Sequence, residues 1–104
     1  MNLTVNKSTA SKGSSRFATF TEEKYTIDYA LICDVRNPDE KIYSLAIALH
    51  ENGINIDSCY LFDISRSERE AHNIFDKFAR LGVSPAEAPI IISEMASPFY
   101  QCNN

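Results

Sequence analysis

The sequence has few of the residues from which well-known catalytic motifs are built. Its only glycines are Gly13, Gly53 and Gly82, so a glycine-rich phosphate-binding loop cannot form. There is no G-x-S-x-G motif and no C-x-x-C pair, and His50-Glu51 lacks the second histidine of the H-E-x-x-H zinc motif. The most specific signatures of nucleotide-binding proteins, serine hydrolases and zinc hydrolases are therefore excluded.

Long apolar runs are also missing. No stretch approaches the roughly 20 apolar residues that a membrane-spanning helix needs, and residues 1–7 lack the cationic start and apolar stretch of a secretory signal. The three cysteines are Cys33, Cys59 and Cys102, an odd number that favours reduced thiols over a disulfide framework. We therefore expect a soluble, cytoplasmic protein without membrane association.

Positive charge is scarce beyond the N-terminal segment. The chain has 10 Lys and Arg against 14 Asp and Glu, and residues 1–21 contain Lys7, Lys12 and Arg16 but no acid. The remainder therefore holds 7 basic against 14 acidic residues. Since this part of the chain would repel a phosphate backbone, we expect no nucleic-acid partner.

The length of 104 residues is sufficient for one domain with one core. Residues 1–21 are rich in Ser, Thr, Lys and Asn, which predicts a flexible polar N-terminal arm. Residues 22–97 are predicted to form a single α+β domain, and residues 98–104 a loose C-terminal tail.

Alternating apolar residues predict three antiparallel strands. Apolar side chains fall at every odd position from Tyr25 to Val35, and a second alternating run covers residues 42–50. Asn52-Gly53 is typical of a type I′ hairpin turn and leads into a third strand over residues 54–64. A two-residue loop and a regular ladder then predict one core face on the second and third strands, formed by Tyr43, Leu45, Leu49, Tyr60 and Phe62.

Two helices are predicted after the strands. Residues 65–68 read as a capping box, and Gly82 is placed to end the first helix. Residues 84–87 form a second capping box, from which a helix should run through Met95 although Pro89 weakens its first turns. The apolar stripe predicted for the first helix consists of Ala71, Ile74, Phe75, Phe78 and Leu81. The predicted fold is α+β, a three-stranded antiparallel β-meander followed by two C-terminal helices packed on one face.

Three segments resemble a known family. The stretch 61–65 ends a strand with D-I-S, and 82–85 starts a helix with V-S-P, followed by the apolar segment 90–94. Over residues 25–95 the chain resembles an uncharacterised family of short Firmicutes-type bacterial proteins, a domain of unknown function. These motifs are turn and capping chemistry, so the resemblance implies no activity and no catalytic residue. The longer polar N-terminal arm and Pro89 depart from the family pattern.

One helix face offers candidate site chemistry. His72 lies one turn after Glu68 and one turn before Asp76, as in a half-formed metal or acid–base site. The same spacing is typical of a solvated helix face. Cys33 belongs to the core row, whereas Cys59 is predicted to point to the opposite sheet face, where an accessible thiol could react. We assign no catalytic residue, no metal site and no cofactor.

The second sheet face has an unusual composition, because small and apolar residues form its centre and polar residues surround them. The predicted centre is Ala30, Ile32, Ala46, Ala48, Cys59 and Leu61. The predicted rim is Asp28, Asp34, His50, Asp57 and Asp63. This face is either an interaction surface or is covered from within the chain, by Phe17 and Phe20 or by the second helix.

Two functions are consistent with these patterns. The first is a small non-enzymatic interaction or regulatory module with a protein partner or a second copy as ligand. The alternative is a small metal-dependent or oligomer-assembled enzyme that uses Glu68, His72 and Asp76. The sequence names neither the partner nor the oligomeric state.

Overall fold

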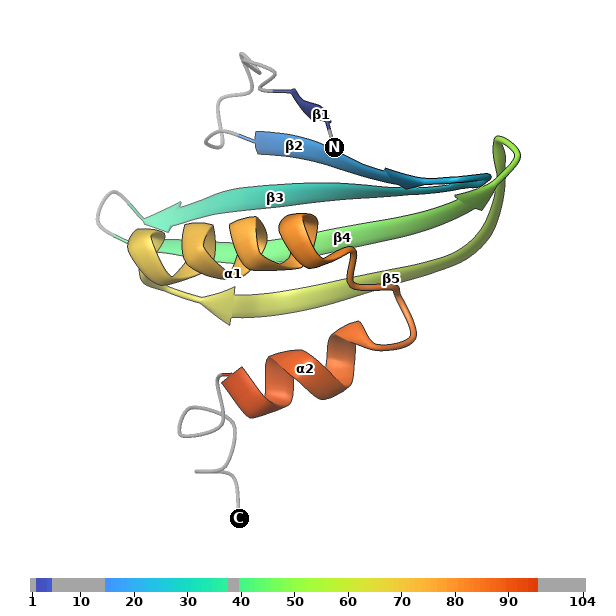
Figure 1. Cartoon of the computed structure of the whole chain (residues 1–104). Coiled ribbons are helices and arrows are strands. Elements are labelled where there is room, and N and C mark those ends of the chain that lie inside the picture. Colours follow the sequence, from blue (N-terminus) through green and yellow to red (C-terminus); the bar gives the residue numbers. More distant parts are fainter. Residues whose placement is uncertain (1, 5–14, 38–39, 96–104) are drawn as a thin grey trace.

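The computed structural model describes residues 2–4, 15–37 and 40–95. Its sheet contains five antiparallel strands in the order β1-β2-β3-β4-β5, so each strand pairs with the next one along the chain (Figure 1). The strands are β1 (Asn2–Thr4), β2 (Ser15–Glu22), β3 (Tyr25–Asn37), β4 (Glu40–Glu51) and β5 (Ile54–Ser65). The helices are α1 (Glu68–Leu81) and α2 (Ala88–Met95).

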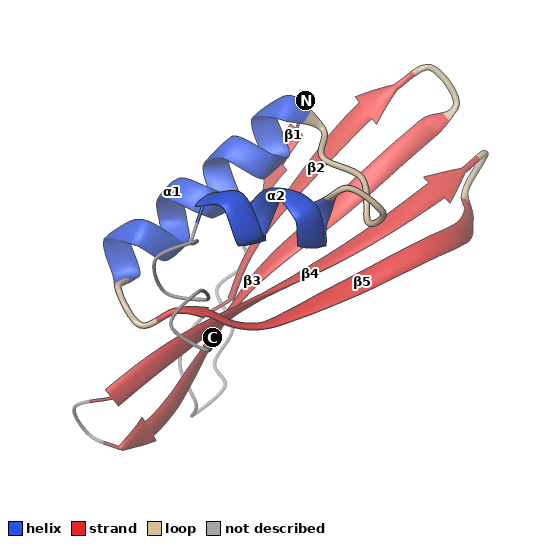
Figure 2. Ribbon diagram, turned by 90° about the horizontal axis from the view of Figure 1, so that it is seen from below, coloured by secondary structure: helices blue, strands red, loops and turns tan. Residues whose placement is uncertain are grey.

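Both helices lie on the same side of the sheet (Figure 2). Helix α1 contacts β2, β3, β4 and β5, whereas α2 contacts β5. The predicted α+β class, with an antiparallel sheet and two C-terminal helices on one face, is therefore confirmed. Among the described residues, no helix covers the other face of the sheet.

The prediction of three strands is wrong, because Ser15–Glu22 forms β2 and lies beside β3. The same segment was expected to belong to a flexible arm. The strand was not predicted because most of the segment is polar. Its side chains nevertheless alternate between the two faces of the sheet: Ala18 and Phe20 face the helices, and Phe17 faces away from them. Residues 2–4 of the predicted arm also form a strand, β1, which pairs with β2. Residues 1 and 5–14 of the arm, and the predicted tail at 98–104, lie outside the described residues.

The core lies between the sheet and the helices. Its largest fully buried side chains are Tyr29, Leu45, Ile47, Ile64, Phe75 and Phe78. The predicted stripe of α1 is confirmed except for Leu81, which is 57% exposed. Gly82 adopts a left-handed φ of 70°, and its amide and that of Val83 both donate to the Phe78 carbonyl. Because the chain turns here, Val83 enters the core in place of Leu81.

The two capping boxes behave differently. The first helix is capped by Ser67 rather than by the predicted Ser65, because the Ser67 hydroxyl accepts from the Glu70 amide. The Ser65 hydroxyl instead donates to the Glu70 carboxylate at 2.7 Å. The second box forms as predicted between Ser84 and Glu87, but the α-helical hydrogen-bond pattern is assigned only from Ala88.

The β4–β5 turn is as predicted, and the register after it is not. Asn52 and Gly53 both have positive φ, and Glu51 pairs with Ile54. The next pairs are His50 with Asn55 and then Leu49 with Asp57, so a β-bulge at Ile56 adds one residue to β5. The extra residue exchanges the two faces of the strand beyond it.

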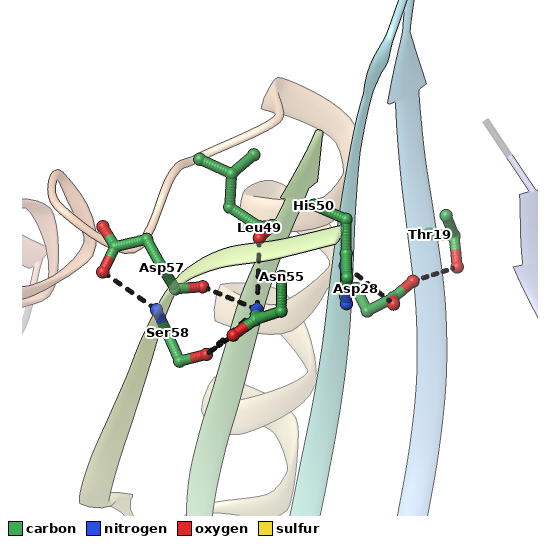
Figure 3. Close-up of polar contacts among 7 residues, drawn as sticks. All are labelled: Thr19, Asp28, Leu49, His50, Asn55, Asp57 and Ser58. Carbon is green, nitrogen blue, oxygen red and sulfur yellow. Dashed lines mark hydrogen bonds and ion pairs between the residues drawn. The ribbon is translucent and has the colours of Figure 1, made fainter. Parts of the chain in front are cut away.

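Tyr60 and Phe62, which were predicted to lie on the core face, therefore point away from the helices. Cys59 pairs with Ile47 and Leu61 pairs with Leu45 on the helix side, whereas Tyr60 and Phe62 lie on the opposite face. The Asn55 side-chain amide explains why the bulge is stable, because it donates to the backbone carbonyls of Leu49 and Asp57, each at 3.1 Å (Figure 3).

Candidate interaction surface

The sheet face opposite α1 and α2, named here the uncovered face, carries one apolar row across four strands. Phe17 of β2 pairs with Ala30 of β3, Ala30 pairs with Ala46 of β4, and Ala46 pairs with Tyr60 of β5. Paired residues of antiparallel strands project to the same side, so these four side chains lie next to one another. The row combines small side chains in the middle with an aromatic ring at each end.

This arrangement forms a groove with a volume of about 480 Å³. Ala30, Ala46 and Ala48 form its floor on β3 and β4, and Phe17 and Tyr60 form its walls on β2 and β5. Small floor residues between large walls produce a hollow where a uniform row would be flat. The volume falls within the roughly 300–1,000 Å³ typical of ligand sites.

The aromatic wall on β5 continues beyond the groove. Tyr60 and Phe62 pack edge to face, with ring centroids 4.4 Å apart and planes at 76°. Tyr60 is 42% exposed and Phe62 is 71% exposed. Such pairing fixes the two rings relative to each other while leaving them accessible, as is common in contact surfaces.

A polar cluster closes one end of the uncovered face. The Thr19 hydroxyl donates to the Asp28 carboxylate at 2.9 Å, and Nδ1 of His50 lies 3.6 Å from the same carboxylate (Figure 3). The three residues come from β2, β3 and β4, so the cluster spans adjacent strands. The Asp28 side chain remains 51% exposed and is available to a partner.

A second charged cluster lies at the other end. The Arg36 guanidinium donates to Asp34 at 3.1 Å and lies 3.6 Å from Asp63. The hydrogen bond to Asp34 and the nearby Asp63 charge raise the pKa of Arg36. One guanidinium thus lies close to two carboxylates, so the three side chains together carry a net negative charge.

The predicted surface is brought together only in part. Ala30, Ile32, Ala46 and Ala48 share the uncovered face, but the bulge places Cys59 and Leu61 on the helix side. Burial raises the pKa of the Cys59 thiol, and the Asp57 charge adds to the shift, so this thiol is poorly suited to act as a nucleophile.

Sequence reasoning missed the two groove walls. In β2, Phe17 lies on one face of the sheet and Ala18 and Phe20 lie on the other, so the period of two that indicates a strand was present in the sequence. No comparable signal exists for Tyr60, because its face depends on the bulge at Ile56.

The predicted intramolecular covers lie elsewhere in the described structure. Phe20 lies on the helix side, where its ring carbons are within 3 Å of the position that a Cβ on Gly82 would occupy. Helix α2 contacts β5 on that side too. Phe17 is a wall of the groove, so neither Phe20, Phe17 nor α2 covers its floor.

The candidate acid–base residues form a different structure from the one predicted. Arg16 of β2 donates to Nδ1 of His72 at 2.9 Å and to Asp76 at 2.7 Å, and its guanidinium lies 4.7 Å from the centroid of the Phe75 ring. Because an arginine side chain only donates hydrogen bonds, Nδ1 of His72 is the acceptor in this contact. A cation therefore already lies between His72 and Asp76, which is where a metal would need to bind.

Within residues 2–4, 15–37 and 40–95, no group of three or more His, Cys, Asp or Glu side chains is placed to hold a metal ion. None of the described helices is both long and apolar enough to cross a membrane. The class that emerges is a small α+β meander domain with helices on one face and an apolar groove on the other.

Comparison with known proteins agrees with that class and adds no activity. The chain belongs to the family of unknown function DUF6514, whose model matches residues 9–97. This membership confirms the predicted resemblance to a domain of unknown function. Neither a curated protein nor a solved structure matches the chain.

Proposed function

We propose that this protein is a non-enzymatic interaction module of the bacterial cytoplasm that binds a protein through the uncovered face. The observation that carries this proposal is the apolar row from Phe17 to Tyr60, which lies opposite both helices. Contiguous apolar surface is costly to expose to water, and on soluble proteins it usually marks a contact site.

The layout of the face suits a protein contact. Its centre is apolar and its two ends carry carboxylates, which matches the dry core and polar rim of known interfaces. The exposed Tyr60 and Phe62 are aromatic residues, which are enriched in such interfaces. The alternative metal-dependent activity has no comparable support, because Arg16 already bridges His72 and Asp76.

The proposal is tested by placing a charge on the groove floor. Ala48→Lys should leave folding unchanged, because a long side chain on a solvated strand face can extend into water. It should abolish any complex formed through this face, because the ammonium group would be desolvated there. The matched control is Asn73→Lys, which adds the same charge at an exposed position of α1.

Both variants are compared with the wild-type chain by thermal melting, by sedimentation velocity over a concentration series, and by crosslinking in the native cell. The expected outcome is normal melting for both variants, with association lost only in Ala48→Lys. Association that is equally present in Ala48→Lys and wild type would contradict the proposal. Unfolding of Ala48→Lys would show that the face is covered from within the chain.

A further inference from the structure

The groove on the uncovered face has room for one aromatic ring between its walls. Phe17 of β2 and Tyr60 of β5 lie at the two ends of the apolar row, three strand spacings apart, which is about 14 Å. Aromatic rings in contact have centroids about 4.5–7 Å apart, so a ring that touches both walls needs them about 9–14 Å apart. The groove can therefore hold one ring in contact with Phe17 and Tyr60 at once.

The floor beneath that position is apolar and low. Ala30 of β3 and Ala46 of β4 pair with each other between the two walls, and each is half-buried. Because an alanine projects only a methyl group, a ring can approach the backbone of both strands here. Binding the ring would remove the apolar surface of the floor from water, which stabilises the contact.

One charge lies beside this floor. Among the described residues that line the groove, only Asp28 has a charged side chain. Thr19 donates to one of its carboxylate oxygens and Nδ1 of His50 lies 3.6 Å from the other, yet the Asp28 side chain remains 51% exposed (Figure 3). A carboxylate has about four acceptor sites. Asp28 can therefore accept from a further donor, and its charge favours a cationic one.

The spacing along β3 relates this charge to the ring. Asp28 lies two residues from Ala30 on the same face, about 7 Å along the strand. Residues two positions apart in an extended segment have the same spacing, and residues three or four positions apart on a helix lie about 5–6 Å from each other. A single short segment can thus place a ring on the floor and a cation at Asp28.

Other occupants account for the groove less well. Among the described residues β5 ends the sheet, so its outer edge can accept an added strand, but that strand would lie beyond Tyr60 and leave the floor open. A second copy offers Tyr25 beside Lys24, but Lys24 is already paired with Glu51 at 2.8 Å.

The two longer stretches outside the described residues each lack half of the combination. Residues 5–14 contain two lysines but no aromatic residue, whereas residues 96–104 contain Phe99 and Tyr100 but no Lys or Arg. The ring and the cation together are therefore best supplied by a different protein.

We propose that the groove binds one aromatic side chain of a partner protein, and that Asp28 pairs with a Lys or Arg about two to four positions from it in the partner's sequence. This inference rests on the proposed function, since it needs the uncovered face to be a contact surface. It adds the residue types that the partner inserts and the place where each of them binds.

The test is a selection from a displayed library of random 12-residue peptides on the full-length wild-type protein. Ala48 lines the groove and pairs with Asp28, so peptides that also bind Ala48→Lys are removed, and Asn73→Lys is the control that should retain binding. The best peptides are synthesised together with versions in which Ala replaces the aromatic residue or Gln replaces the cationic one. Their affinities are measured for the wild type and for two matched pairs of variants.

The first pair tests the charge. Asp28→Asn should weaken binding about two- to fivefold. Asp34→Asn removes the same charge from the same face of β3 outside the groove, and it should leave the affinity unchanged. The peptide with Gln in place of its cation should bind Asp28→Asn and the wild type equally, because the ion pair is already lost.

The second pair tests the wall. Tyr60→Ala should weaken binding about three- to tenfold, because the bound ring loses one of its two aromatic contacts. Phe62→Ala removes the neighbouring exposed ring, which does not line the groove, and it should change the affinity less than about twofold. All four variants replace exposed side chains, so thermal melting should show each of them folded.

Competing occupants predict other results, each of which would overturn the inference. Peptides that all bind Ala48→Lys as well as the wild type would indicate strand addition at the edge of β5. Peptide binding that tightens in Phe99→Ala/Tyr100→Ala would assign the groove to the chain's own tail. Peptide binding that tightens as the protein is diluted would assign it to a second copy.

The sequences of the selected peptides decide the remaining cases. Peptides without an aromatic residue, or without Lys or Arg near it, would overturn the inference, as would equal effects within either pair of variants. The proposed function would still stand if Ala48→Lys abolished association of the protein in solution or in the cell. Both proposals fail if it did not.

Discussion

The guanidinium of Arg16 in β2 donates a hydrogen bond of 2.7 Å to the carboxylate of Asp76 in α1. The same group donates to His72 and lies over the ring of Phe75, so one side chain contacts three residues of the helix. These contacts join a strand near the edge of the sheet to a helix 60 positions further along the chain. Arg16 therefore helps to hold β2 in the domain.

We expect Arg16→Ala to lower the free energy of unfolding by about 1–2 kcal/mol. The ion pair is partly exposed and contributes up to about 1 kcal/mol, and the contact with the Phe75 ring adds a similar amount. Urea denaturation of both proteins measures the difference. Lys77→Ala, at an exposed position of the same helix, is the control and should change the value by less than about 0.5 kcal/mol. Equal effects of the two substitutions would remove the proposed role of Arg16.

Phe78→Ala should lower the free energy of unfolding by about 3–5 kcal/mol, because the Phe78 ring is fully buried between α1 and the sheet. A loss of that size could unfold so small a domain at room temperature. The measurement is denaturant unfolding followed by circular dichroism. The exposed Leu81 of the same helix is the control, and Leu81→Ala should cost well under about 1 kcal/mol.

Gly82→Ala should destabilise the protein more than Gly53→Ala. Both glycines have positive φ, so each substitution carries a backbone cost of about 1–2 kcal/mol. A Cβ on Gly82 would also lie 2.6 Å from the Phe20 ring, whereas a Cβ on Gly53 meets nothing within 4 Å. The additional cost should be largely relieved in the double variant Gly82→Ala/Phe20→Leu. Equal melting temperatures for the two single variants would contradict the close contact with Phe20.

Stability should decrease at alkaline pH. Burial raises the pKa of Tyr43 to about 12, with further contributions from Cys33, and burial also raises the pKa of Tyr29, whose hydroxyl donates to the Val83 carbonyl. Between pH 10 and about 12 the unfolded chain loses these protons before the folded one does, so the free energy of unfolding decreases as pH rises. Below pH 10 these two groups should add no slope.

Urea denaturation from pH 8 to 12 measures this dependence, and Tyr43→Phe should make it shallower. The control is Tyr60→Phe, because Tyr60 is exposed on the other face. A slope unchanged by Tyr43→Phe would show that other groups cause the alkaline destabilisation.

The sequence by itself determined the features that depend on neighbouring residues. Alternation of apolar side chains placed Ile27, Tyr29 and Leu31 in the core, and Asn52-Gly53 specified the turn between β4 and β5. Gly82 ended α1 because glycine adopts the left-handed conformation at little cost. Each of these follows from the local backbone preferences of a few consecutive residues.

Only the tertiary structure decided which residues form the groove. The bulge at Ile56 depends on an Asn55 side chain that bonds to carbonyls on two strands, and it moves Tyr60 to the uncovered face. Likewise, the polar segment of β2 becomes a strand because β3 pairs with its backbone and α1 supplies partners for Arg16. These contacts join residues far apart along the chain, and periodicity within one segment carries no information about them.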